Sequence, residues 1–405
     1  MTRKYMLVSL LLASGLVLLI ILFAGPTAEE AHQLRRVAVR ASAANNLASD
    51  LQALQPGSSL AIDRPTRILN FTDFRLVLDA KCNHLGEENV EDWQVDSGGT
   101  AKAVWIITSY AGDTSKRSAL RRAYTSEELK QLGVRRIFLL GSLDDNAKIK
   151  TGVTQEAIEN EAHRYRDIVQ GNFVEAYRNL TYKHLMGLQW AAERCGDSYS
   201  LIMKMDDDIV VNLYEAMDLL TNKYNTNFQE DFLIGYVMEN MSPVRNTASK
   251  WFVKEEEFPN EVYPDFLSGW FYAIDIRAAL KLIYQSKHHF NYFWIDDLFV
   301  TGILREEIGI QNFINIKDLF TTDYRFLECC LKYTESQPKY KCDFIFGPDG
   351  AQKDLVLTFK EYSKDCYQRY NCTRRPKEQL LKNKCILNYK NINLATGRAQ
   401  IESLA

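Results

Sequence analysis

Four short apolar runs alternate with longer amphipathic stretches in the middle of this 405-residue chain. They cover residues 103–109, 136–141, 200–205 and 232–238, and each has the length and continuous hydrophobicity of a strand buried on both faces. Strands that alternate with helices predict an α/β fold with a Rossmann-like, mostly parallel sheet flanked by helices. In such sheets, ligands bind at the carboxyl ends of the strands.

Between the second and third runs, apolar positions recur at intervals of three and four residues, as on one face of a helix. His184 belongs to this stripe, and we interpret it as a buried, hydrogen-bonded core histidine without a catalytic role. The stripe consists of Phe173, Tyr177, Leu180, His184, Leu188 and Ala191.

An uncharged stretch at residues 6–25 is long enough to cross a membrane, because about 20 helical residues span roughly 30 Å. Basic residues precede it and acidic residues follow it, which predicts a cytosolic tail at 1–5, a signal anchor at 6–25 and a luminal body, in type II topology. The Ala-, Ser- and Gln-rich residues 26–66 are expected to form a stem. A cleaved signal peptide is the alternative.

Six of the eight cysteines lie in the last quarter of the chain, where no Cys-X-X-Cys pair and no histidine accompanies them. We therefore expect residues 325–405 to be a disulfide-linked, basic extension in an oxidising lumen, and not a zinc site. Glycosylation sequons at Asn70, Asn240 and Asn371 agree with a luminal location. The net charge of −3 argues against nucleic-acid binding. The cysteines are Cys329, Cys330, Cys342, Cys366, Cys372 and Cys385.

Three consecutive aspartates, Asp206, Asp207 and Asp208, follow directly on the third apolar run. The end of a strand places them at the carboxyl edge of the sheet. Carboxylates are hard oxygen ligands that favour Mn²⁺ or Mg²⁺, and such an ion neutralises a diphosphate that three acids alone repel. The pattern therefore predicts a divalent cation and a nucleotide diphosphate at this edge. An acidic turn or a helix N-terminus is the alternative interpretation.

A second acidic pair, Asp296 and Asp297, lies between aromatic residues and the start of an amphipathic stretch. Helix capping explains such a pair equally well. Two acidic clusters in one α/β chain nevertheless suggest a division of labour, in which one cluster holds a metal ion and the other supplies a general base.

Several longer patterns occur in order between residues 101 and 316. A basic block, KRSALRRAY, covers 116–124; RIFLLG follows; and YRDIVQGNFVEAYRNLTYKH covers 165–184. The triple aspartate, YPDFLSGWFY at 263–272 and IDDLFVTG at 295–302 complete the series. In this order they resemble the β-1,3-galactosyltransferase and β-1,3-N-acetylglucosaminyltransferase family of Golgi hexosyltransferases.

The resemblance implies a GT-A fold over residues 67–324, a UDP-sugar donor, a Mn²⁺ or Mg²⁺ cofactor and inversion at the anomeric carbon. It implies that Asp297 is the general base and that the principal metal ligand is Asp208, with Asp206 beside it. The donor is expected to contact Arg117, Arg121, Asp206, Asp207, Ser268 and Gly269.

Two features depart from the family pattern. Trp270 and Phe271 replace glycines where the family brings backbone close to the sugars, and no histidine follows His289 to serve as a late metal ligand. We expect a Golgi type II enzyme that transfers galactose in β-1,3 linkage to a glycan on protein or lipid. The alternatives are a UDP-N-acetylhexosamine transferase and a catalytically silent luminal sugar-binding protein.

Overall fold

The computed structural model describes residues 75–82, 102–226, 231–289, 291–311, 313–332 and 340–387. The predicted cytosolic tail, signal anchor and stem, together with Asn70, lie outside these residues. Among the residues that are described, no helix is both long and apolar enough to cross a membrane.

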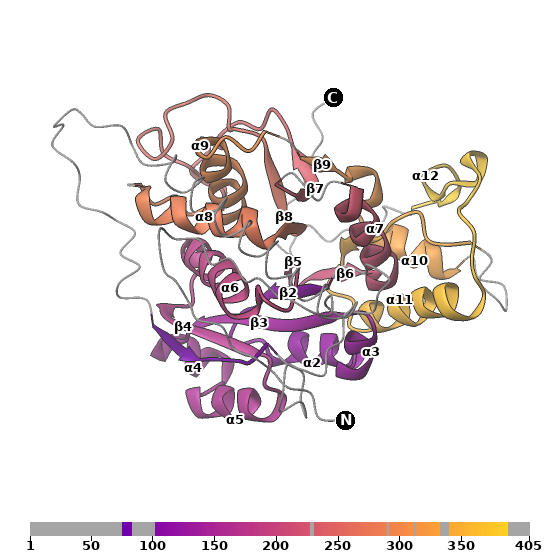
Figure 1. The fold of residues 1–405 in the computed structure, drawn as a ribbon, viewed down its shortest axis with the longest axis horizontal. Coiled ribbons are helices and arrows are strands. Elements are labelled where there is room, and N and C mark those ends of the chain that lie inside the picture. Colours follow the sequence, from indigo (N-terminus) through magenta and orange to yellow (C-terminus); the bar gives the residue numbers. More distant parts are fainter. Residues whose placement is uncertain are drawn as a thin grey trace, which may run out of the picture. The chain divides into compact units, whose positions relative to one another are not determined.

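The described part of the chain is built on an eight-stranded sheet with the order β1-β4-β3-β2-β5-β8-β7-β9 (Figure 1). The central pairs β3–β4, β2–β3 and β2–β5 are parallel, as is β7–β9 at one edge, whereas β1–β4, β5–β8 and β7–β8 are antiparallel. The strands are β1 (Leu76–Leu78), β2 (Ala103–Thr108), β3 (Val134–Ser142), β4 (Ile168–Val174), β5 (Leu201–Asp206), β7 (Leu233–Met238), β8 (Phe266–Asp275) and β9 (Ile314–Asn315).

The four predicted strands are confirmed as β2, β3, β5 and β7, and four of the seven strand pairs are parallel, a smaller share than predicted. The sheet is mixed because β8 runs between β5 and β7 in the opposite direction to both. Nothing in the buried run of β8 encodes a direction, since strands buried on both faces have similar composition whether they are parallel or antiparallel.

Helices cover both faces of the sheet, and the alternation along β2 decides which side chains meet which layer. Val104 and Ile106 pack with α6 and α8, whereas Trp105 and Ile107 pack with α2, α3 and α7. The helices are α2 (Thr114–Ala123), α3 (Ser126–Gln131), α4 (Asp145–Thr151), α5 (Gln155–Tyr165), α6 (Leu180–Cys195), α7 (Leu213–Thr226), α8 (Ile276–His288) and α9 (Arg305–Glu307), with a π-helical segment η4 (Leu298–Leu304).

The predicted helical stripe starts too early. Helix α6 begins at Leu180, after a single 3-10 turn at Tyr177–Asn179, and Phe173 belongs to β4. Residues 168–174 instead complete hydrogen bonding to β3 and β1, which a helix cannot provide. The interpretation of His184 as a buried, hydrogen-bonded histidine is confirmed, because its side chain is fully buried and hydrogen-bonded at both ring nitrogens.

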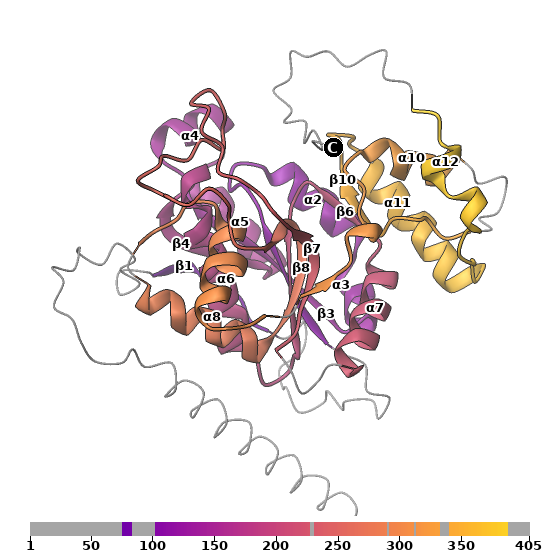
Figure 2. The ribbon, with the colours of Figure 1, turned by 90° about the horizontal axis from the view of Figure 1, so that it is seen from above.

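The Cys-rich extension folds beside the sheet with a small core of its own (Figure 2). It contains α10 (Tyr324–Lys332), β10 (Phe346–Pro348), α11 (Leu355–Lys364) and α12 (Leu381–Lys384), and β10 pairs antiparallel with β6 (Ile209–Val211). All eight cysteines form disulfides, as predicted for the six in the extension: Cys82–Cys195, Cys329–Cys385, Cys330–Cys342 and Cys366–Cys372.

Two of the predicted glycosylation sites, Asn240 and Asn371, are exposed, and both have a positive φ (55° and 44°), a conformation that asparagine tolerates in turns. Asn179, in a further sequon, is half-buried, and its amide nitrogen donates to the carbonyl of Val174. Glycan attachment at the exposed pair stays a prediction.

Candidate active site

The three aspartates lie at the carboxyl end of the central strand β5, as the sequence predicts. Asp206 ends the strand opposite Thr108 of β2, and Asp207 and Asp208 form the turn that leads into β6. We call residues 206–208 the acidic turn. Asp207 has the least exposed side chain of the three at 13%, Asp206 is 34% exposed, and Asp208 is exposed.

A buried lysine brings the acidic turn and the second acidic pair together. Lys204 points the same way from β5 as Asp206, because side chains two residues apart share a face of a strand. Its Nζ donates to Asp206 Oδ1 at 2.7 Å and to the carbonyl of Gly269 at 2.8 Å, and it lies 3.7 Å from Asp296 Oδ2. Segments about 90 residues apart therefore converge on one ammonium group.

Gly269 on β8 completes this junction. Its N–H donates to Asp297 Oδ2 at 3.0 Å, while Asp297 Oδ1 accepts from the N–H of Leu298 at 2.9 Å. A Cβ at position 269 would stand 3.0 Å from Lys204 Nζ and 3.4 Å from Asp297 Oδ2, so only glycine allows the approach without displacing a neighbour. Ser268 is half-buried, and its Oγ accepts from the N–H of Trp270.

His184 and Tyr272 hold Asp296 from the opposite side. His184 Nδ1 lies 2.9 Å from Asp296 Oδ2, and its Nε2 lies 2.5 Å from the hydroxyl of Tyr272. Burial lowers the pKa of His184, which keeps the ring neutral. A neutral ring that donates from Nδ1 to the carboxylate must accept from Tyr272 at Nε2. We call Lys204, Asp206, Asp296 and Asp297 the acidic site.

The acidic site holds three carboxylates against one lysine, and the pKa values diverge accordingly. Burial raises the pKa of Asp206 to about 7, assisted by Asp208 and Asp296. Burial and the charge of Asp296 raise the pKa of Asp297 to about 6. Burial opposes ionisation of Asp296 as well, but Lys204 and His184 outweigh it and lower its pKa. Adjacent carboxyl groups with separated pKa values are typical of acid–base sites.

Asp207 faces Lys116 at the start of α2. Its Oδ1 lies 3.2 Å from Lys116 Nζ, and its Oδ2 is buried without a hydrogen-bond partner among the described residues. Such an orphaned oxygen and the exposed carboxylate of Asp208 suit a cation that also takes phosphate or water oxygens. Within the described residues, however, no three side chains of the types His, Cys, Asp and Glu come together as a ready-made metal site.

The two arginines that were expected to contact the donor lie in the interior of the fold. Arg117 is fully buried and donates to Glu161 at 2.7 and 2.8 Å and to the carbonyls of Tyr110 and Ala111. Arg121 pairs with Glu161 at 2.6 Å and with Asp167 at 2.7 Å. The structure thus places both guanidinium groups in an interior network, where Arg117 shapes the loop after β2 instead of presenting its charge to a ligand.

Sequence reasoning missed a second charged clasp at the strand ends. Glu175 accepts from the N–H groups of Gly141 at 2.8 Å and Ala111 at 3.2 Å, and it forms an ion pair with Lys183, whose Nζ also donates to the carbonyl of Ser109. It thereby joins the loop after β2, the end of β3 and the segment after β4. The sequence shows Glu175 within the 165–184 pattern and Lys204 two residues before Asp206. Neither pattern indicates which residues these two side chains contact in the fold.

Trp270 and Phe271, which replace family glycines, both pack against apolar side chains. Phe271 is fully buried and stacks on Phe346 of the extension with ring centroids 4.2 Å apart, so it does not line a sugar pocket. Trp270 is partly buried and packs against the core on the α7 side of the sheet.

Comparison with known proteins gives the chain a family. Residues 115–315 match the family model described as Galactosyltransferase. The chain is 31% identical over 209 residues to "Beta-1,3-galactosyltransferase 5" of Pan troglodytes, covering 51% of this chain and 66% of that one. It is 32% identical over 213 residues to "Beta-1,3-galactosyltransferase 1" of Mus musculus, covering 52% and 62%. The matched region therefore spans just under two thirds of these relatives.

Among solved structures, the galactosyltransferase LgtC, in a complex with donor and acceptor sugar analogues, aligns with 69% of this chain at 10% identity and a TM-score of 0.30, a likeness from which we argue nothing. The sequence matches carry the assignment. The matched residues 115–315 are those of a galactosyltransferase domain. More narrowly, this matched region belongs to the β-1,3-galactosyltransferase family.

Proposed function

We propose that this protein is an inverting, GT-A-type hexosyltransferase that moves galactose from UDP-galactose to a hydroxyl group of a glycan in β-1,3 linkage. The convergence of the acidic turn and Asp297 on Lys204 and Gly269 is the observation that carries the proposal, because transfer needs a diphosphate site and a base within reach of one sugar. The galactosyl donor follows the names of the relatives.

In the proposed reaction, the acceptor hydroxyl attacks the anomeric carbon from the face opposite the diphosphate. The new C–O bond forms as the bond from that carbon to the phosphate oxygen breaks, and UDP leaves with the electron pair. Asp297 takes the proton of the hydroxyl, for which a carboxyl pKa near 6 suits a base that works close to neutral pH. Gly269 N–H holds the carboxylate in place.

The acidic turn is the proposed donor end of the site. Asp208 and Asp206 would hold Mn²⁺ or Mg²⁺, and Asp207 and Lys116 would face the nucleotide. A bound cation supplies charge neutralisation for the departing diphosphate. Lys204 keeps Asp206 and Asp296 from repelling each other, and Glu175 fixes the loops around the nucleotide. Arg117 acts on the loop after β2 from inside the fold, through the carbonyls of Tyr110 and Ala111.

A donor screen with the purified full chain tests the proposal. We expect transfer from UDP-galactose to exceed transfer from UDP-N-acetylglucosamine and UDP-N-acetylgalactosamine. Chelation should abolish transfer and Mn²⁺ should restore it, and Asp208→Ala should weaken binding of UDP in the presence of Mn²⁺. Absence of transfer from every donor, with UDP still bound, would favour a silent sugar-binding protein. Full activity in excess chelator would remove the metal from the proposal.

We also propose that the protein is a type II Golgi membrane protein with its catalytic body in the lumen, on the strength of residues 6–25 and the disulfides. Alkaline carbonate extraction should leave the full chain in the membrane pellet, and the body should resist protease in sealed microsomes. A shortened, soluble product would identify a cleaved signal peptide instead.

A further inference from the structure

The Cys-rich extension is hydrogen-bonded directly to the acidic turn, although it lies beyond the family match, which ends at residue 315. Strand β10 pairs with β6 so that Pro348 stands opposite Ile209. The N–H of Asp349 donates to the carbonyl of Asp208 at 2.7 Å, and the N–H of Asn212 donates to the carbonyl of Ile345 at 2.9 Å. The extension therefore holds the turn's exit strand at both of its ends.

Aromatic stacking fixes β10 against the main sheet. Phe346 is 1% exposed, and its ring stacks between Phe271 of β8 at 4.2 Å and Phe320 at 4.5 Å. Phe271 is two residues from Gly269, the glycine that contacts both Lys204 and Asp297. Phe271, which replaces a family glycine, is therefore the residue of β8 on which the extension packs, beside the acidic site.

The loop after β10 is held in a single shape. Gly350 and Ala351 both have positive φ, 60° and 58°, and a Cβ at Gly350 would stand 2.3 Å from the ring of Tyr324. Asp349 Oδ1 accepts from the N–H of Ala351 at 2.7 Å and closes this turn. Asp349 lies close enough to Lys116 for its charge to help raise the pKa of that lysine, together with Asp207 and Asp208.

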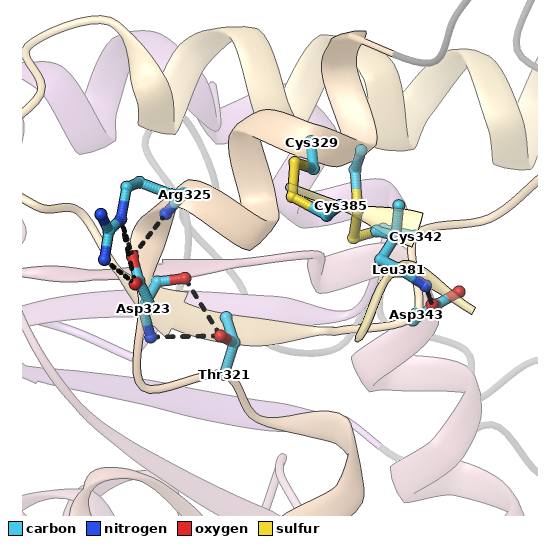
Figure 3. The surroundings of a disulfide bond; sticks show 9 residues. Thr321, Asp323, Arg325, Cys329, Cys342, Asp343, Leu381 and Cys385 are labelled. Carbon is cyan, nitrogen blue, oxygen red and sulfur yellow. Dashed lines mark hydrogen bonds and ion pairs between the residues drawn. A yellow bond between two sulfur atoms is a disulfide. The ribbon is translucent and has the colours of Figure 1, made fainter. Parts of the chain in front are cut away.

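Disulfides connect this strand to the rest of the extension (Figure 3). Cys330–Cys342 ties α10 to the segment that enters β10, and Cys329–Cys385 ties α10 to the end of α12. Nearby, Asp343 accepts from the N–H of Leu381 at 2.6 Å. Cys366–Cys372 closes a local loop after α11 that contacts the segment entering β10, where the N–H of Lys341 donates to the carbonyl of Thr373 at 2.9 Å.

We propose that the Cys-rich extension is a constituent of the donor site, in which Phe346 and Asp349 are positioning residues that hold the acidic turn in the geometry that binds a nucleoside diphosphate. This inference rests on the proposed function. The chain connects its acidic turn to an independent, disulfide-linked core, and loosening that core should weaken donor binding before it affects the chemistry at Asp297.

The first experiment compares two disulfide deletions in the full chain. Cys330→Ala with Cys342→Ala frees the segment before β10, whereas Cys82→Ala with Cys195→Ala, which removes a disulfide in the core on the α6 side of the sheet, is the matched control. We expect the dissociation constant of UDP, measured by calorimetry with MnCl₂ present, to rise about tenfold in the first variant and to stay within about twofold in the control. The KM for the UDP-sugar should rise with it, while the KM for the acceptor should not.

Equal UDP affinity in both variants would overturn the proposal, provided that limited proteolysis shows the freed segment to be cleaved faster. A wild-type chain that binds UDP but transfers no sugar would contradict the proposed function and leave this inference standing. If the first variant does not fold, Phe346→Leu, which keeps an apolar side chain of similar size but removes the stack, is expected to produce the same selective loss of UDP affinity.

A second pair of variants tests Asp349. Asp349→Asn keeps an oxygen that accepts from Ala351, whereas Asp349→Ala removes it, so only the alanine variant should loosen the turn and weaken UDP binding, by about threefold to tenfold. An equal loss in both variants would mean that the charge itself contacts the ligand or its cation, and would overturn the positioning role. No loss in either would remove Asp349 from the donor site.

Discussion

Two charged networks lie on the same sheet and differ in how their charges balance. The arginine network joins Arg117, Arg121 and Arg136 to Glu161 and Asp167, three cations against two anions, with every side chain at most 11% exposed. The acidic site has three anions against Lys204, and Asp206 keeps 34% of its side chain exposed.

The pKa shifts follow that balance. In the arginine network, burial opposes the ionisation of Glu161, but hydrogen bonds and charge from Arg117 and Arg121 win and lower its pKa. In the acidic site, burial wins at Asp206 and Asp297 and raises their pKa values. A network in which every carboxylate is paired with arginines stabilises a fold, whereas one with more carboxylates than cations is ready to receive a ligand, an ion or a proton.

The largest effect is expected from breaking the arginine network. Arg117→Ala leaves Glu161 without its principal partner in the interior, so we expect a loss of about 3–5 kcal/mol in the free energy of unfolding, measured by denaturant titration of the full chain. UDP affinity of the folded fraction should change much less. Near-normal stability combined with lost UDP binding would return Arg117 to the donor pocket.

Asp297→Asn is the corresponding change in the acidic site. The amide keeps the size of the side chain but cannot accept the proton of the acceptor hydroxyl, so turnover should fall by at least about 10²-fold with little change in donor KM. Asp265→Asn, an exposed aspartate near the start of β8, is the matched control and should be silent. Asp296 does not serve as a control, because it is bound by His184 and lies beside Lys204. Normal turnover in Asp297→Asn would exclude this base.

The two networks also show which features of the structure can be predicted from the sequence and which cannot. Buried strands can be recognised in the sequence because β2, β3 and β5 each contain a run of apolar residues. An acidic run at a strand end can also be placed, because its position on the sheet follows from the strand. The sequence does not show which charged side chains pair with one another. Arg117 and Asp206 look equally functional in sequence, and only the tertiary structure shows that the first is satisfied by Glu161.

The extension illustrates the same limit. Its cysteines predict disulfides, but fifteen full pairings of six cysteines are possible, and the pairing depends on the fold. In the sequence, Phe271 replaces a glycine at a place where the family brings backbone close to the sugars. The structure shows that the ring faces Phe346, a residue 75 positions away that no local pattern connects to it.

The pH dependence of turnover tests the acidic site further, with an expected change of about tenfold. The groups that act on Asp297 are the Asp296 charge, the Lys204 ammonium and the N–H groups of Gly269 and Leu298, and with burial they give a pKa of about 6. Only the ionised carboxylate is a base, so turnover at saturating donor should rise with pH through about 6 and be about tenfold below its plateau at pH 5. A profile that is flat from pH 5 to 7 would contradict this role.

The smallest expected effect is on the free energy of unfolding. Replacing a carboxylate by its amide should change this free energy in opposite directions in the two networks. The pKa of Asp297 is about 6 in the folded protein and 3.8 ordinarily, so the folded state binds more protons than the unfolded state between these values. The free energy of unfolding therefore falls as pH rises from about 4 to about 6, and the cost is fully present above 6.

Asp297→Asn carries no such cost, because the amide does not titrate. It should be more stable than the wild type by about 1 kcal/mol at pH 8, and the difference should vanish near pH 4. Denaturant midpoints at the two pH values measure it. Glu161→Gln should behave in the opposite way, because the lowered pKa of Glu161 contributes stability at neutral pH that its amide cannot supply. Destabilisation of both amide variants at pH 8 would mean that the carboxylate of Asp297 is as fully satisfied as that of Glu161, and the distinction between a structural and a functional network would fail.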